Sequence, residues 1–101
     1  MEVKAAFIFI GPEINTDEAR ALIDTPVIKL KVIGVRTYDE AVKAAVALAD
    51  EGVTAIELCG GFGNIGTGKI ARAVKGKAEV GVVRFDHHPG LGHKSGDDVF
   101  S

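Results

Sequence analysis

Apolar and polar residues alternate along this chain in blocks that predict strands and helices in turn. The run VKAAFIFI is apolar and is closed by Gly11 and Pro12, which is typical of a buried strand. The segment INTDEARALID offers N-caps at Asn15 or Thr16 and acids in its first turn, so it predicts a helix. VIKLKVIGV alternates lysines with aliphatic residues and predicts a strand with one buried face.

The second half of the chain continues the same alternation. Thr37 and Glu40 form a Thr-x-x-Glu capping box, and the apolar stripe after them predicts a helix that stops at Gly52. VTAIELCG predicts a third strand, GFGNIGTG a loop, KIARAV a short helix, and AEVGVVRF a fourth strand. From Asp86 onward no period is visible, so we expect a loop followed by a C-terminal tail over residues 90–101.

Short connections between alternating strands and helices are typical of parallel sheets with right-handed crossovers. The predicted fold class is α/β, with four parallel strands that alternate with three helices in an open, flavodoxin-like sheet over a single domain, residues 1–101. The apolar first strand is then central, and the lysine-striped second strand lies at the edge. The alternative is half of a (βα)8-barrel, in which Lys29, Lys31, Glu57 and Arg84 would share an uncovered face.

Composition narrows the function classes. The chain has 101 residues, 47% of them apolar, which suits one soluble core. The net charge is −2 and no basic run occurs, so we expect no nucleic-acid partner, and no apolar run approaches the ~20 residues of a membrane span. The single cysteine, Cys59, is typical of a reducing cytoplasm. A charged sheet face needs water or a partner, so we expect a homo-oligomer.

Ligands of parallel α/β folds bind beyond the carboxyl ends of the strands. Two of these ends carry most of the candidate chemistry, namely the Cys59–Asn64 loop and the Asp86–His93 loop. If the third and fourth strands are neighbours, both loops form one rim. A small-molecule or anion-binding site is therefore predicted there.

The first of these loops is rich in glycine. GFGNIG fits the dinucleotide fingerprint G-x-G-x-x-G, and Asp86 follows it at the end of the next strand. The same stretch nearly matches a phosphate-binding P-loop, but Ile70 replaces the Ser/Thr that magnesium requires. A more general expectation is that backbone amides at the start of the following helix bind an anion, whereas the structural alternative is a tight turn. The residues expected to bind a ligand or anion are Gly60, Gly61, Phe62, Gly63 and Asn64.

The second loop carries all three histidines of the chain. Asp86, His88 and His93 offer oxygen and nitrogen donors that suit a divalent metal such as zinc or manganese, although adjacent histidines at a strand end point apart. Without a metal, Asp86 would orient His87 or His88 as a general base. The structural alternative is a hydrogen-bonded loop that orders the tail.

Two further positions carry reactive or charged groups. Cys59 lies beside the glycine loop, where a helix N-terminus favours a nucleophilic thiolate, although a lone cysteine is more often a small buried apolar residue. The candidate catalytic residues are thus Cys59, Asp86, His87 and His88. Glu57 and Arg84 are expected to form an ion pair across adjacent strands, and the alternative is that they face a pocket.

The motifs AAFIFI, GVTAIELCGGFGN and GVVRFDHHPG also carry a resemblance. Over nearly its whole length, the chain resembles a small family of prokaryotic proteins known only as domains of unknown function. The resemblance is most specific in the loops CGGFG and DHHPG. It implies a compact α/β domain, and it implies no activity, substrate or cofactor.

Three function classes follow from these features. The first is a small-molecule site at the two-loop rim. The second is a metal-dependent hydrolase or lyase at the same place. The third is a non-catalytic structural or sensing oligomer, in which Leu91, Val99 and Phe100 of the tail dock on a neighbouring copy.

Overall fold

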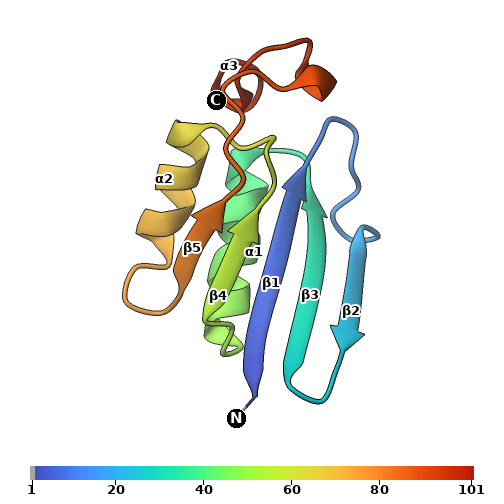
Figure 1. The fold of residues 1–101 in the computed structure, drawn as a ribbon, viewed down its shortest axis with the longest axis vertical. Helices are drawn as coiled ribbons and strands as arrows, with labels where there is room; N and C mark the ends of the chain where they lie inside the picture. Colours follow the sequence, from blue (N-terminus) through green and yellow to red (C-terminus); the bar gives the residue numbers. More distant parts are fainter. Residues whose placement is uncertain (1) are drawn as a thin grey trace.

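A central sheet of five strands organises the chain in the computed structural model, which describes residues 2–101 (Figure 1). The strand order is β2-β3-β1-β4-β5, so the apolar first strand is central, as predicted. β1 runs parallel to β3 and β4, and β4 runs parallel to β5, whereas β2 pairs antiparallel with β3. The strands are β1 (Val3–Ile10), β2 (Arg20–Asp24), β3 (Ile28–Val35), β4 (Ala55–Leu58) and β5 (Glu79–Val82).

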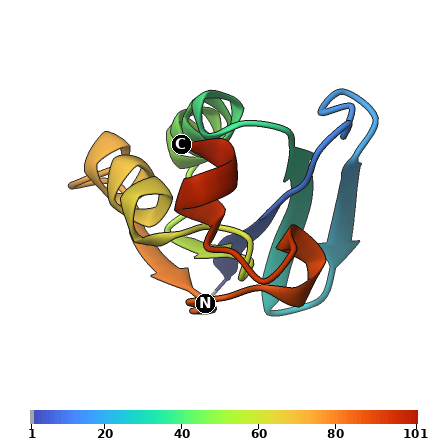
Figure 2. The same ribbon diagram turned by 90° about the horizontal axis from the view of Figure 1, so that it is seen from above.

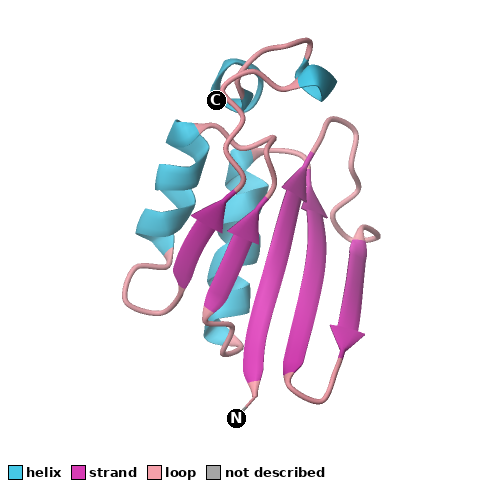
Figure 3. Ribbon diagram, in the orientation of Figure 1, coloured by secondary structure: helices cyan, strands magenta, loops and turns pink. Residues whose placement is uncertain are grey.

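Both longer helices lie on one face of this sheet. These are α1 (Tyr38–Asp50) and α2 (Asn64–Ala73), and the view from above shows them on the same side (Figure 2). The tail, expected to be a loop, contains the 3-10 turn η1 (Pro89–Leu91) and the short helix α3 (Gly96–Phe100), which lie above the carboxyl edge of the sheet (Figure 3). Among residues 2–101, no helix has the length and apolar character needed to cross a membrane.

The hydrophobic core lies between the sheet and the two helices. Helix α1 begins where the capping box predicts, since the Thr37 side chain accepts a hydrogen bond from the Glu40 amide at 3.1 Å. It ends before Gly52, whose φ of 100° favours glycine. Alternate residues of the strands face this core, and its members include Ala6, Ile8, Ile33, Ile56, Leu58, Ala45, Leu48 and Ile70.

The predicted helix over INTDEARALID is wrong. Asn15 accepts a hydrogen bond from the Asp17 amide at 3.0 Å through its side chain, so the capping residue closes a turn instead of starting a helix. The rest of the segment forms β2, and Thr25 closes the hairpin to β3 by accepting a hydrogen bond from the Ile28 amide at 2.9 Å. The sheet therefore has a fifth, antiparallel strand, and the four parallel strands keep the order 2-1-3-4 of a flavodoxin-like sheet.

The position of β3 also differs from the prediction. β2 occupies the edge, so the lysine-striped strand is the second strand of the sheet. Lys31 pairs in register with the buried Ala6 and forms an ion pair with Glu51 on the helix side. Glu57 pairs with Phe7 and lies on the opposite face, so the lysines and Glu57 do not share a face.

A substitution at Gly34 tests the packing of the face without helices. An added Cβ at Gly34 would lie 2.5 Å from Cζ of Phe9, whereas one at Gly81, also in the sheet, would meet nothing within 4 Å. We expect Gly34→Ala to lower the free energy of unfolding by about 1–3 kcal/mol because of overpacking. Gly81→Ala is the matched control and should change it little. Equal effects in urea-induced unfolding would contradict this register.

Candidate functional site

A small pocket lies at the carboxyl edge of the sheet, where the Cys59–Asn64 loop meets the start of the Asp86–His93 loop. β4 and β5 are neighbours, so the loops that follow them emerge side by side. The pocket has a volume of about 180 Å³. Its lining residues come from both loops and from the start of the tail: Phe62, Gly63, Asn64, Val82, Arg84, Phe85, Asp86 and Ser95.

The tail is fastened to the glycine loop by the carboxylate of Asp97. Its Oδ2 accepts a hydrogen bond from the amide of Ile65 at 2.9 Å, and its Oδ1 accepts one from the amide of Gly66 at 3.1 Å. The Tyr38 hydroxyl donates to the same Oδ1 at 2.9 Å and accepts from the amide of Gly63 at 3.0 Å. A residue of α3 therefore caps the N-terminus of α2 and is joined to α1 through Tyr38.

Three glycines make this close approach possible. A Cβ at Gly63 would lie 2.3 Å from Cγ of Asp97, and one at Gly66 would lie 2.3 Å from Cζ of Tyr38. A Cβ at Gly96 would lie 1.9 Å from the carbonyl oxygen of Gly61. Two glycines of the apparent nucleotide fingerprint, Gly63 and Gly66, thus make room for the chain's own tail and for Tyr38.

Burial and these hydrogen bonds determine the charge states of Asp97 and Tyr38. Burial acts to raise the pKa of Asp97, but the hydrogen bonds from Ile65, Tyr38, Gly66 and Asn64 outweigh it and leave the pKa below its ordinary value. Burial raises the pKa of Tyr38 to about 12, with the Asp97 carboxylate adding to the shift and the Gly63 amide opposing it. At neutral pH a charged carboxylate therefore faces a neutral hydroxyl donor.

The anion expected at the glycine loop is thus supplied by the protein. The amides of Ile65 and Gly66 at the start of α2, which the sequence offers to a ligand, already bind Asp97. This interaction also explains why α2 begins at Asn64, five residues before the predicted KIARAV helix. Sequence reasoning missed Asp97, although Ser95 followed by two acids is an N-cap pattern, and Ser95 does accept from the Asp97 amide at 3.1 Å.

Two of the three histidines, His88 and His93, help to order the loop after Asp86. Nδ1 of His88 accepts a hydrogen bond from the Gly90 amide at 3.0 Å, and its ring packs against Phe85 with centroids 4.6 Å apart. His93 has a φ of 61°, and its amide donates to the His88 carbonyl at 2.9 Å. His87 is exposed. These contacts match the structural alternative for this loop.

Cys59 lies between the ends of β1 and β4. Its sulfur accepts hydrogen bonds from the amides of Ile10 and Gly61, both at 3.4 Å, and the side chain packs half-buried against the core. Among residues 2–101, no hydrogen bond joins Cys59, Asp86 or a histidine to another member of that set. The arrangement therefore contains no ready nucleophile and base pair, and the catalytic roles stay predictions.

The structure also shows where the predicted metal ligands and the two residues of the predicted ion pair lie. Within residues 2–101, no three His, Cys, Asp or Glu side chains form a group that could hold a metal ion, so Asp86, His88 and His93 are not brought together as a ligand set. The predicted Glu57–Arg84 pair is wrong. Nε of Arg84 instead donates to Asp86 at 2.9 Å, on the rim of the pocket, because both side chains leave the same side of the chain.

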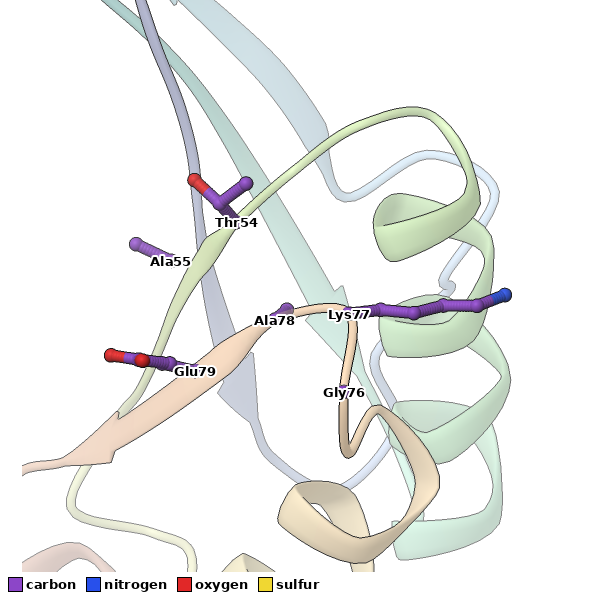
Figure 4. A pocket seen from close by; sticks show the side chains of 6 residues that line it. All are labelled: Thr54, Ala55, Gly76, Lys77, Ala78 and Glu79. Atoms are coloured by element: carbon purple, nitrogen blue, oxygen red, sulfur yellow. The ribbon is translucent and has the colours of Figure 1, made fainter.

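A larger hollow lies at the opposite end of the sheet, away from the two loops that line the small pocket. It has a volume of about 490 Å³ and lies at the amino ends of β4 and β5. Figure 4 shows the side chain of Lys77 extending over α1, away from those of Thr54 and Glu79. Lys77 forms an ion pair with Asp50 at 2.7 Å. Lys77 thus points away from the other polar side chains that Figure 4 labels, and the smaller pocket, at the carboxyl ends of the strands, is the better candidate.

Comparison with known proteins places the chain in a family. A model of a family of unknown function matches residues 3–98. The chain belongs to DUF6506. No curated protein and no solved structure matches it. Membership in DUF6506 confirms the resemblance to a family without assigned activity, while the prokaryotic origin of that family stays a prediction.

The Asp97 contact predicts a pH-dependent effect in this DUF6506 chain. We expect Asp97→Asn to lower the free energy of unfolding at pH 7 by about 1 kcal/mol, as for a lost helix cap. Because the pKa of Asp97 is lowered by folding, its contribution is full above the unfolded value of about 3.9 and is lost as the pH falls through the folded value. The deficit of the variant should therefore shrink near pH 3.

Thermal unfolding followed by circular dichroism checks this expectation. Asp98→Asn is the matched control, since Asp98 is the next residue of α3 and is exposed. The control should unfold as the wild type does at both pH values. Equal shifts for the two variants would contradict the cap.

Proposed function

We propose that the chain binds a small anionic molecule in the pocket between the Cys59–Asn64 loop and the Arg84–Asp86 segment. The observation that carries the proposal is the lining of this pocket, in which residues from both loops and from the tail surround about 180 Å³. A water molecule occupies about 30 Å³, so the pocket suits a ligand about as large as six waters. This is the size of a small carboxylic acid or an inorganic oxyanion.

Arg84 supplies the chemistry that would hold such a ligand. Its Nε is engaged by Asp86, while its two terminal amino groups make no hydrogen bond to the described residues. A guanidinium carries five N–H donors, so the terminal pair is available for a carboxylate or phosphate group. The side chain is 68% exposed and can turn toward the pocket without a large desolvation cost.

The rest of the lining supports a mixed polar and apolar ligand. Phe62 is buried and closes the floor of the pocket, and Val82 adds an aliphatic wall. Asn64 and Ser95 offer neutral hydrogen-bonding groups from α2 and from the N-cap of α3. Asp86 would contact a donor group on the ligand. An anion with one hydroxyl or amino group therefore matches the lining.

The proposal is for binding and does not include turnover. The candidate nucleophile and bases make hydrogen bonds with the backbone and with Arg84, and not with one another. The amides at the start of α2 also hold Asp97, so they are not offered to the ligand. The pocket thus binds the anion through Arg84 and not through the glycine loop.

Two-dimensional NMR titration with succinate, glycine and phosphate tests this proposal. We expect at least one probe to shift the amide signals of Asn64, Arg84 and Ser95, and Arg84→Gln to weaken its binding about tenfold, as for loss of one charged hydrogen bond. Arg72→Gln, on the last turn of α2, is the matched control and should bind as the wild type does. Shifts confined to residues 76–79, or no shift with any probe, would contradict the proposal.

A further inference from the structure

The face of the sheet opposite α1 and α2 is uncovered and apolar. The register of the strands places the odd-numbered residues of β1 on this face, together with their partners on β2, β3, β4 and β5. Two of them are large and exposed, with Ile23 at 52% and Ile28 at 45%. The face carries Val3, Ala5, Phe7, Phe9, Ala21, Ile23, Ile28, Leu30, Val32, Ala55, Glu57, Glu79 and Gly81.

The open face lacks a helix because of the route that the chain takes from β1 to β3. In a doubly covered sheet, the connection from β1 to β3 would be a helix on the face opposite α1 and α2, because crossovers are right-handed and this one runs the other way along the sheet. Here that connection is the edge strand β2. As a result, β3 turns its aliphatic residues Leu30 and Val32 to the open side and its lysines to the helix side.

We infer that a second copy of this chain covers the open face, packing sheet against sheet in a two-fold dimer. Each strand residue occupies about 16 Å² of a sheet plane, so the strands that overlap in such a dimer, β1 to β4, present on the order of 400 Å² on this face. Two copies bring together about 800 Å² of flat area, and because side chains make each face rough, the buried surface approaches the roughly 1,000 Å² that a specific interface needs. A face of this extent falls in the range of the largest apolar patch on a typical monomer, about 300–600 Å², and such patches are often functional.

The charges on the face fit a second copy better than a charged partner. Among its strand positions the charged side chains are Glu57 on β4 and Glu79 on β5, both away from β2 and β3. A two-fold contact centred between β1 and β3 places β5 of each copy beyond the edge strand β2 of the other. Glu79 then stays in water and Glu57 lies at the rim, so no carboxylate is buried without a partner.

The tail offers a neighbouring copy less apolar surface than its sequence suggests. Phe100, one of the predicted tail anchors, packs against its own core and lies 6.0 Å from the Tyr38 ring between centroids. That anchor is not available to a neighbour. The apolar residues of the strands on the open face are available to a neighbour.

Sedimentation equilibrium over a concentration series tests the dimer. The wild type should have twice the 10.6 kDa mass of one chain, and Val32→Glu should raise the dissociation constant on the order of a hundredfold because it buries an unpaired charge. Ile23→Glu, at an exposed position of β2, should do the same and decides the matter if Val32→Glu does not fold. Val46→Glu is the matched control, since Val46 is an exposed apolar residue of α1 on the other side of the sheet.

Two results would overturn the inference. One is a wild type that sediments as a monomer at every concentration, which would leave the face to a different protein or to a lipid surface. The other is a dimer that both face variants leave as tight as the wild type, which would place the contact elsewhere, for example along the edge of β2. Circular dichroism of each variant shows whether it is folded.

Discussion

The carboxylate of Asp97 holds three parts of the chain that lie far apart in the sequence. It accepts hydrogen bonds from the amides of Ile65 and Gly66 and from the hydroxyl of Tyr38. Because of this contact, the tail returns over the carboxyl edge of the sheet, α2 begins at the glycine loop, and Ser95 becomes a wall of the pocket. A glycine-rich loop before a helix is usually interpreted as a binding site for an anionic ligand. Here the anion is part of the fold, and the ligand site that we propose lies beside it.

A second constraint is the conformation of residues 11–27. Had they formed a helix, as their acids and capping residues suggest, the sheet would be covered on both faces. They form a turn and the edge strand β2 instead, so the helices lie on one face and the apolar residues of β3 point to the other. The proposed binding pocket and the proposed dimer interface thus use different surfaces of one sheet.

Hydrophobic periodicity predicted the four parallel strands, the central place of β1 and the capping box of α1, because each depends on neighbours in the sequence. It failed at Asn15–Asp24, because Asx turns and helix N-caps use the same residues. It also failed in the tail, where the order comes from Asp97 meeting amides more than thirty residues away. The rule that ligands bind at the carboxyl ends of strands located the pocket, but the occupant of the glycine loop depends on long-range packing that no local pattern encodes.

An NMR titration of the Asp97 carboxyl carbon, followed together with the amide protons of Ile65 and Gly66, tests the central contact most directly. We expect the pKa of Asp97 to lie below the ordinary value for this group, and we expect the two amide signals to shift with the same midpoint because these amides donate to the carboxylate. A contrary result would be an Asp97 that titrates at or above its ordinary value while both amides stay unchanged. The tail would then not be fastened to the glycine loop by this carboxylate.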